Sequence, residues 1–263
     1  MNREALSPSR PANGARDRSD RENGSEGGSE EGDASLKALF GTKPTVSRLQ
    51  LDGMVLVSEP SGDPLHSCHQ PTADRFIRDE SGRAFASVEH YCHFQTMAKL
   101  NLTREAESIL EVEASQTFDK ANSIVRENIP PNFQQVDQLV NFLVSCREHF
   151  TKVALQRFMV ANPDVAVELL ATEQDLVVVC QGNDRDMGIG AEADTFVSWA
   201  KNNGVNAAKL YDWLIHPKNR PAQLPIGDNK LGFILMELRE ELRAAQQGAS
   251  RRHNRILHNN CVV

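Results

Sequence analysis

The sequence predicts an α+β protein: one predominantly helical domain with a small β-sheet. Several long segments place apolar residues three and four positions apart, which is the spacing of one buried helix face. Two shorter runs indicate a sheet of few strands: 176–179 is rich in β-branched residues, and 49–57 is apolar around an Asp-Gly turn signal. A length of 263 residues, with 40% hydrophobic and 25% charged side chains, suits one medium-sized domain with tails.

The first strand signal, at residues 49–57, indicates a strand pair or one bulged strand, because Asp52-Gly53 is a turn signal. Ser87 is then a good helix cap, and a helix is expected over 88–100. Further helices are expected at 105–110 and 118–125. Pro130-Pro131 breaks the chain before the next helix.

The central stretch is expected to read helix, helix, strand and loop. An amphipathic helix at 136–143 leads into an apolar face at 150–158, and Asn162-Pro163 then favours a new helix start capped by Asn162. The run 176–179 is the buried strand. Three glycines between 182 and 190 surround two aspartates, in a loop that can bring bare backbone close to a ligand.

The last part of the domain is expected to contain two helices. Residues 206–215 carry apolar side chains on one face, and a longer stripe follows from Leu231 to Leu242. We expect Asp228 to cap that last helix and Gly248 to end it.

The two ends of the chain differ from the domain in composition. Residues 1–34 carry almost no large apolar side chains, so they cannot offset the entropy of ordering, and we expect a disordered, dispensable tail. We place the domain at 35–246 and a flexible basic tail at 247–263.

Charge and cysteine content exclude several classes of protein. The net charge of -7 argues against a general nucleic-acid binder. Five scattered cysteines make no disulfide framework and fit a reducing compartment. No stretch approaches the ~20 apolar residues of a membrane span, and no apolar core of a secretion signal is present. We expect no membrane partner, and a location in the cytoplasm with the nucleus as the alternative.

The order of these pieces resembles the NADAR family, named for NAD and ADP-ribose, whose bacterial members of the YbiA type are N-glycosidases. Three blocks carry the resemblance in the right order: SVEHY at 87–91, a helix pair with its loop, and NKLGFILMELREELR at 229–243. The middle block reads Arg157-Phe158, Asn162-Pro163, Leu169-Leu170, Thr172 and Asp184 with Met187-Gly188-Ile189-Gly190.

The resemblance implies a YbiA-like fold and a hydrolase that needs no cofactor. Its substrate would be a nucleotide-like small molecule: ADP-ribose, NAD or a phosphoribosyl-amine such as that of the riboflavin pathway. Nucleic acid would then be a partner only as an ADP-ribosylated base. Relatives pass quickly from the glycine loop to the last helix, so residues 191–228 are read as an insertion.

The resemblance also implies the site residues. Glu89 and Asp184 match the family's two acids, and Glu89 stands in the first turn of its helix, where the helix dipole favours the ionised form. The implied ligand-binding residues are Ser87, His90, Thr96, Lys120, Met187, Gly188, Gly190 and Asn229. Backbone N–H groups beside the loop glycines would suit a phosphate.

Three positions depart from the family's working set. Thr96 stands where a lysine is expected, two helical turns from Glu89 and on the same face. Val179 replaces a glutamate and Met187 a tryptophan. These changes favour an alternative: a catalytically degenerate relative that binds ADP-ribose, NAD or a protein partner without turnover.

A further alternative is a zinc site. The pattern H-x-C-H occurs at 66–69 and again at 90–93, and His and Cys are common zinc ligands. This spacing differs from the usual C-x₂-C and H-x₃-H pairs, so we expect no metal.

Overall fold

The computed structural model describes residues 48–58, 65, 77–113, 116–128, 136–221 and 226–260, and for 136, 137 and 249–260 it describes the backbone alone. The expected N-terminal tail and the H-x-C-H motif at 66–69 therefore lie outside the described residues. Within them, the chain is the expected mainly helical α+β domain with small sheets.

The main sheet has three strands in the order β1-β2-β5. Strands β1 (Leu49–Leu51) and β2 (Met54–Ser58) form an antiparallel pair, and β2 runs parallel to β5 (Leu176–Cys180). Asp52 (φ 45°) and Gly53 (φ 79°) join the first two strands, so the predicted strand pair with its Asp-Gly turn is confirmed. Strands β3 (Ile77–Arg78) and β4 (Ala84–Phe85) form a separate small hairpin.

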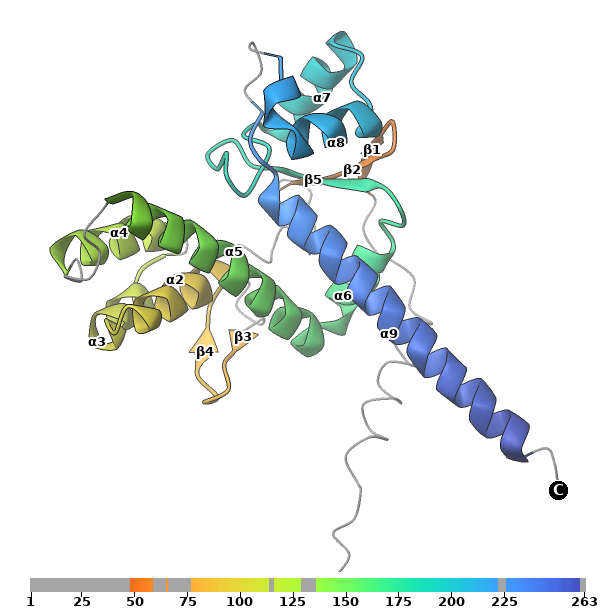
Figure 1. Cartoon of the computed structure of the whole chain (residues 1–263), viewed down its shortest axis with the longest axis horizontal. Coiled ribbons are helices and arrows are strands. Elements are labelled where there is room, and N and C mark those ends of the chain that lie inside the picture. The colour runs from red at the N-terminus through yellow and green to blue at the C-terminus, as the bar shows by residue number, and fades with distance from the viewer. Residues whose placement is uncertain are drawn as a thin grey trace, which may run out of the picture.

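Helices cover both faces of the main sheet (Figure 1). On one face lie α7 (Ala193–Asn202) and α8 (Ala207–Ile215), which pack against Leu176, Val178 and Cys180. On the other face the alternate residues Val177 and Val179 join the larger core. Because β5 is buried on both faces, its apolar run shows no alternation.

The larger core joins the helices of the first half of the domain. These are α2 (Val88–Lys99), the short α3 (Thr103–Ala106) with a 3₁₀ turn at Glu107–Ile109, and α4 (Thr117–Glu127). The predicted helices at 88–100 and 118–125 are confirmed, and the one at 105–110 is split. Ser87 caps α2 as predicted, because its hydroxyl accepts a hydrogen bond from the His90 N–H.

Helix α5 (Val136–Ala161) is longer than expected, because the two apolar segments of the central stretch form one helix. Helix α6 (Pro163–Leu170) follows at the predicted place. The predicted cap by Asn162 is wrong: its side chain donates a hydrogen bond back to the Phe158 carbonyl oxygen, 2.9 Å away, and so satisfies the end of α5.

The segment 191–228 contributes α7, α8 and a 3₁₀ turn at Pro217–Asn219. Asn206 caps α8 through the Lys209 N–H, and the helix predicted at 206–215 is confirmed. Trp199 and Trp213 lie in contact, with ring centroids 6.4 Å apart, and both belong to the core over the sheet. This segment therefore completes the cover of β5.

The last helix, α9 (Lys230–Asn260), runs from the sheet along α5 and α6 (Figure 1). Two expectations about its ends are wrong. Asp228 instead pairs with Arg220, and Asn229 (φ 51°) precedes the helix. Gly248 keeps a helical backbone, without the positive φ that would end a helix, so α9 continues past it. No helix among the described residues is long and apolar enough to span a membrane.

Asn229 fixes the start of α9 to the free edge of β5. Its side-chain oxygen accepts a hydrogen bond from the Val179 N–H, and its amide donates to the Val177 carbonyl oxygen, both at 2.9 Å. The side chain thus takes the place of a neighbouring strand. Gly232 allows the close approach, because a Cβ atom there would collide with the Val177 carbonyl oxygen.

Candidate active site

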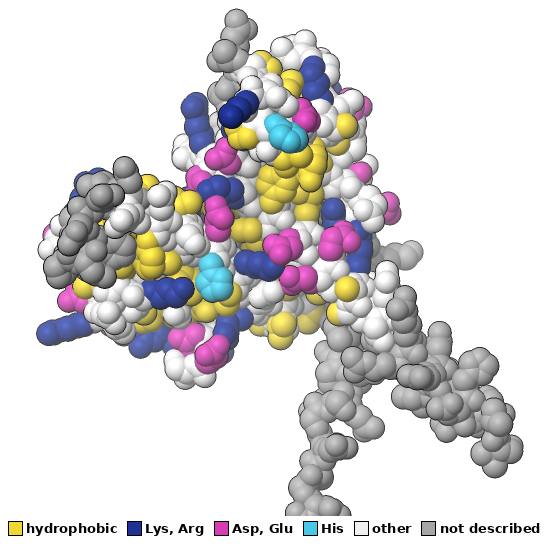
Figure 2. Space-filling model, in the orientation of Figure 1, with side chains coloured by type: hydrophobic (Ala, Val, Ile, Leu, Met, Phe, Trp, Pro, Cys, Tyr) yellow, Lys and Arg dark blue, Asp and Glu magenta, His cyan; other side chains and the backbone are white. Residues whose placement is uncertain are grey.

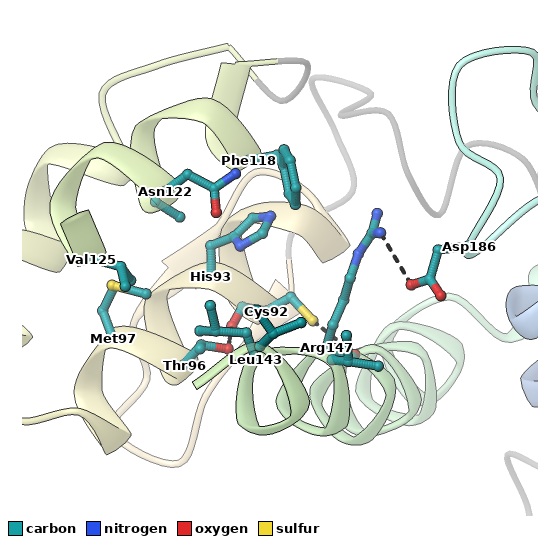
Figure 3. A pocket seen from close by; sticks show the side chains of 13 residues that line it. Cys92, His93, Thr96, Met97, Phe118, Asn122, Val125, Leu143, Arg147 and Asp186 are labelled. Carbon is teal, nitrogen blue, oxygen red and sulfur yellow. Dashed lines mark hydrogen bonds and ion pairs between the residues drawn. The ribbon is translucent and has the colours of Figure 1, made fainter. Parts of the chain in front are cut away.

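A cavity of about 370 Å³ lies between α2, α4 and α5 (Figure 3). This volume is in the range of small-molecule sites. Most of its wall is apolar, and its polar lining residues include His93, Asn122, Arg147 and Asp186. The remaining lining residues are Cys92, Thr96, Met97, Phe118, Ala121, Val125, Val140, Leu143 and Val144.

Arg147, on α5, holds three carboxylates at one end of this cavity. Its Nη2 donates to Asp184 Oδ2 at 2.5 Å and lies 3.5 Å from Glu89 Oε1, and its Nη1 lies 3.5 Å from Asp186 Oδ2. Burial alone would lower the pKa of the guanidinium, but Glu89 and Asp184 outweigh it and hold that pKa above its usual value. Arg147 therefore stays charged and keeps the acids together.

Glu89 also contacts a histidine one turn further along α2. Its Oε2 lies 3.1 Å from His93 Nε2. The His93 and Phe118 rings meet at a steep angle, with centroids 5.9 Å apart, and the Arg147 guanidinium lies 5.7 Å from the Phe118 centroid. A carboxylate, an imidazole and a guanidinium thus meet beside an aromatic ring at the cavity.

The loop after β5 fixes the position of Asp184. Its Oδ1 accepts hydrogen bonds from the N–H groups of Asp186 and Met187, at 3.0 and 2.9 Å, while Oδ2 faces Arg147. The N–H of Gly188 donates to the Asp184 carbonyl oxygen. Gly188 is required by close packing, because a Cβ atom there would lie 2.9 Å from the Gln181 Cβ atom.

A second cation extends the network toward α9. Lys230 Nζ lies 2.7 Å from Asp186 Oδ1 and 2.6 Å from Glu148 Oε1. Among the described residues, the network therefore joins the carboxylates of Glu89, Glu148, Asp184 and Asp186 to the cations of Arg147 and Lys230. Its negative balance suits a positively charged group better than an anion.

The family model of the NADAR domain matches residues 63–243, which is most of the chain. The chain belongs to the NADAR family. Membership supports a glycosidase-like function at the level of the family. No curated protein matches this chain significantly.

A solved structure also resembles this NADAR domain: the NMR structure of the Escherichia coli protein YbiA. The two share 18% sequence identity over 78% of this chain and 93% of that chain, with a TM-score of 0.44.

The structure brings the two acids that the family resemblance implied into one network, since Glu89 and Asp184 share Arg147. Thr96 lines the cavity, and its hydroxyl donates to the Cys92 carbonyl oxygen at 2.8 Å. Lys120 lies half-buried on α4, outside the lining residues of the cavity.

The other implied residues of the NADAR site lie in the scaffold around it. Ser87 and His90 hydrogen-bond each other, and the second His90 nitrogen bonds the Val112 carbonyl oxygen. Met187 is 0% exposed and packs in the larger core. Asn229 holds β5, and Gly188 and Gly190 shape the loop.

Sequence reasoning missed Arg147, which holds the acids of the site together. A signal was present: the apolar stripe of α5 includes Leu139, Leu143 and Phe150, and Arg147 stands on the same face. A charge on an apolar stripe needs a partner. Asp186 and Lys230 were missed as well, because their pairing depends on how the loop meets α9.

Among the described residues, no three His, Cys, Asp or Glu side chains are placed to hold a metal ion together. His90, one histidine of the second H-x-C-H motif, uses both ring nitrogens in hydrogen bonds. Cys92 of that motif bonds Thr151 and the Arg147 carbonyl oxygen.

Proposed function

We propose that this NADAR domain is an N-glycosidase that hydrolyses the N-glycosidic bond of an ADP-ribosyl or phosphoribosyl-amine compound. One observation carries the proposal: the Glu89 carboxylate contacts His93 and Arg147, two residues that line the apolar cavity, and so stands directly behind its wall. The family's activity, as the resemblance implies it, is of this kind.

The reaction needs a carboxylate near the sugar. As the bond between the anomeric carbon and the nitrogen breaks, its electron pair stays on the nitrogen and positive charge develops on the ribose ring. Glu89 would stabilise that charge and take a proton from the attacking water. The nitrogen must gain a proton to leave. The His93 Nε2 atom lies 3.1 Å from Glu89 Oε2 but is out of line for a hydrogen bond, so the imidazole would pass a proton on once its ring turns toward the carboxylate.

The surrounding charges support this assignment of roles. A network with more carboxylates than cations stabilises a cationic ring more than an anionic one. Arg147 is a positioning residue in this scheme, since it keeps Glu89 and Asp184 close without cancelling the local negative charge. We therefore place the ribose, rather than the phosphates, beside the network.

A second candidate function is binding of the same ligands without turnover. Val179 and Met187, at the family's glutamate and tryptophan positions, are both 0% exposed and cannot reach a ligand. Thr96 supplies no cation where the family has lysine. Loss of members from a cooperating set lowers rates by orders of magnitude.

The test is to incubate the protein with ADP-ribosylated guanosine, NAD and the riboflavin-pathway phosphoribosyl-amine. Mass spectrometry would detect the released base or amine and the ribose product, and calorimetry would measure binding in parallel. Glu89→Gln tests the site, and Glu241→Gln, an exposed carboxylate on α9, is the matched control.

Release of base that is lost in Glu89→Gln and kept in Glu241→Gln supports the glycosidase. Binding without release favours the second candidate. No binding of any of the three at millimolar concentration rejects both and leaves a protein-interaction role.

A further inference from the structure

The cavity has two chemically different ends (Figure 3). Arg147 and Asp186 stand at one end, and the rest of the wall includes Met97, Val125 and Leu143. An N-glycoside has the same division, because a flat base of low charge is joined to a polar ribose. With the ribose beside Glu89, the base would lie against the apolar wall.

Helix α4 presents one face to this cavity. Its four lining residues, Phe118, Ala121, Asn122 and Val125, stand at positions 0, 3, 4 and 7 of one helical stripe. Three of them are apolar, and Asn122 is the polar exception. Figure 3 shows its amide on the same side of the cavity as His93 and Phe118.

Asn122 offers an amide group in an apolar setting. Within the described part of the chain its side chain has no hydrogen-bond partner. The amide carries a donor beside an acceptor, so it fits a planar group whose edge carries an acceptor beside a donor. The amino group and N7 of adenine are such an edge, as are N1–H and O6 of guanine and the carboxamide of nicotinamide.

Phe118 supplies a surface for a flat ring. It is 50% exposed although it is large and apolar, and it lines the cavity together with the exposed Val140 and Val144. Figure 2 shows hydrophobic side chains at the surface of this helical part of the molecule. Exposed apolar surface at a cavity is typical of a binding site, and aromatic rings stack on bases.

We propose that the apolar cavity is the leaving-group subsite and that Asn122 selects a heteroaromatic base with a donor beside an acceptor on one edge. This inference rests on the proposed function, because it takes the site beside Glu89 as the place of the ribose. In this arrangement the base is the part of the substrate that is recognised, and Asn122 is the residue that recognises it.

Binding of free bases tests the inference without turnover. NMR-monitored titrations would compare adenine with unsubstituted purine, which lacks the amino group, and nicotinamide with pyridine. One well-placed pair of hydrogen bonds is worth about tenfold in affinity, so we expect adenine and nicotinamide to bind about tenfold more tightly than their partners.

Asn122→Leu keeps the size and removes both polar atoms. We expect adenine binding to fall to the level of purine, with purine unchanged. Asn122→Asp turns the donor into a second acceptor that faces adenine N7, and it should weaken adenine binding as well. Ser123→Ala, the exposed neighbour on α4, is the control and should change neither base.

An unchanged preference for adenine in both Asn122 variants would overturn the inference, as would failure of every base to bind. Turnover with no role for Asn122 would leave the glycosidase standing and reject only the subsite. Selective base binding without any turnover would support the subsite and count against the glycosidase.

Discussion

Arg147, on α5, brings together side chains from two other parts of the chain. Glu89 comes from α2, Asp184 and Asp186 come from the loop after β5, and all three lie within 3.5 Å of its guanidinium. Sequence reasoning identified the two acids through family motifs, each of which is local. It missed the arginine because no motif marks it and its role depends on how α5 packs against α2.

Replacing Arg147 by methionine should destabilise the protein by roughly 2–4 kcal/mol, because it leaves partly buried carboxylates without their cation. Urea denaturation measures the change. Lys152→Met on the same helix is the control: its partners Glu237 and Glu241 are exposed, so the loss should stay within about 1 kcal/mol. Equal losses in the two variants would contradict the role given to Arg147.

Thr96→Lys restores the lysine that the family resemblance implies at this position. Thr96 is 4% exposed and lines the cavity, so a lysine there would place its amine in the cavity, on the helix face that carries Glu89. We expect N-glycosidase activity to rise by about tenfold or more, and Thr96→Met, of similar length without charge, to give no gain. No gain from lysine would favour the binding module.

Met187→Trp, which would restore the tryptophan that the family resemblance implies, is expected to destabilise the protein and is therefore tested apart from Thr96→Lys. Met187 is 0% exposed, and a tryptophan would overpack the core at a cost of roughly 1–3 kcal/mol.

At the scale of elements, β5 and α9 depend on each other through Asn229. The sequence indicated both elements from their apolar patterns, and both are confirmed. It could not show that Asn229 closes the edge of β5, because that contact joins residues 50 and 52 positions apart. The predicted end of α9 at Gly248 was wrong for another reason. A glycine ends a helix only where its φ is positive, and Gly248 does not have a positive φ.

Asn229→Ala should destabilise the domain by roughly 2–3 kcal/mol, since it leaves the Val179 N–H and the Val177 carbonyl oxygen buried without partners. Asn203→Ala is the matched control, because its exposed amide also bonds one backbone carbonyl oxygen. Thermal unfolding of the two variants makes the comparison. Equal melting temperatures would show that the edge of β5 is satisfied in another way.

At the scale of the whole molecule, the described cysteines belong to the core. Burial raises the pKa of Cys92 and Cys146, and it raises the pKa of Cys180 to about 12. At pH 8 these thiols stay protonated in the folded protein and should react slowly with iodoacetamide, while the unfolded chain reacts fast. Mass spectrometry locates the modified residues, and rapid labelling of Cys180 in native protein would contradict its burial.

The raised pKa values of these buried thiols also predict how the stability of the protein changes at high pH. An unfolded thiol titrates near 9, whereas these folded thiols titrate higher. Below pH 9 both states hold the proton and the contribution to stability is complete. Above pH 9 only the unfolded state releases it, so stability should fall as the pH rises toward 12.

The fold and the family followed from patterns spread along the whole sequence, whereas the working site depends on a few contacts between distant elements.

We propose that Glu89 is the carboxylate that acts on an N-glycosidic bond. The most direct measurement is kcat/KM of the natural protein and of Glu89→Gln on ADP-ribosylated guanosine, with folding of both checked by circular dichroism. We predict turnover in the natural protein and a loss of about a hundredfold or more in Glu89→Gln. Strong turnover that survives Glu89→Gln would show that another group acts on the bond.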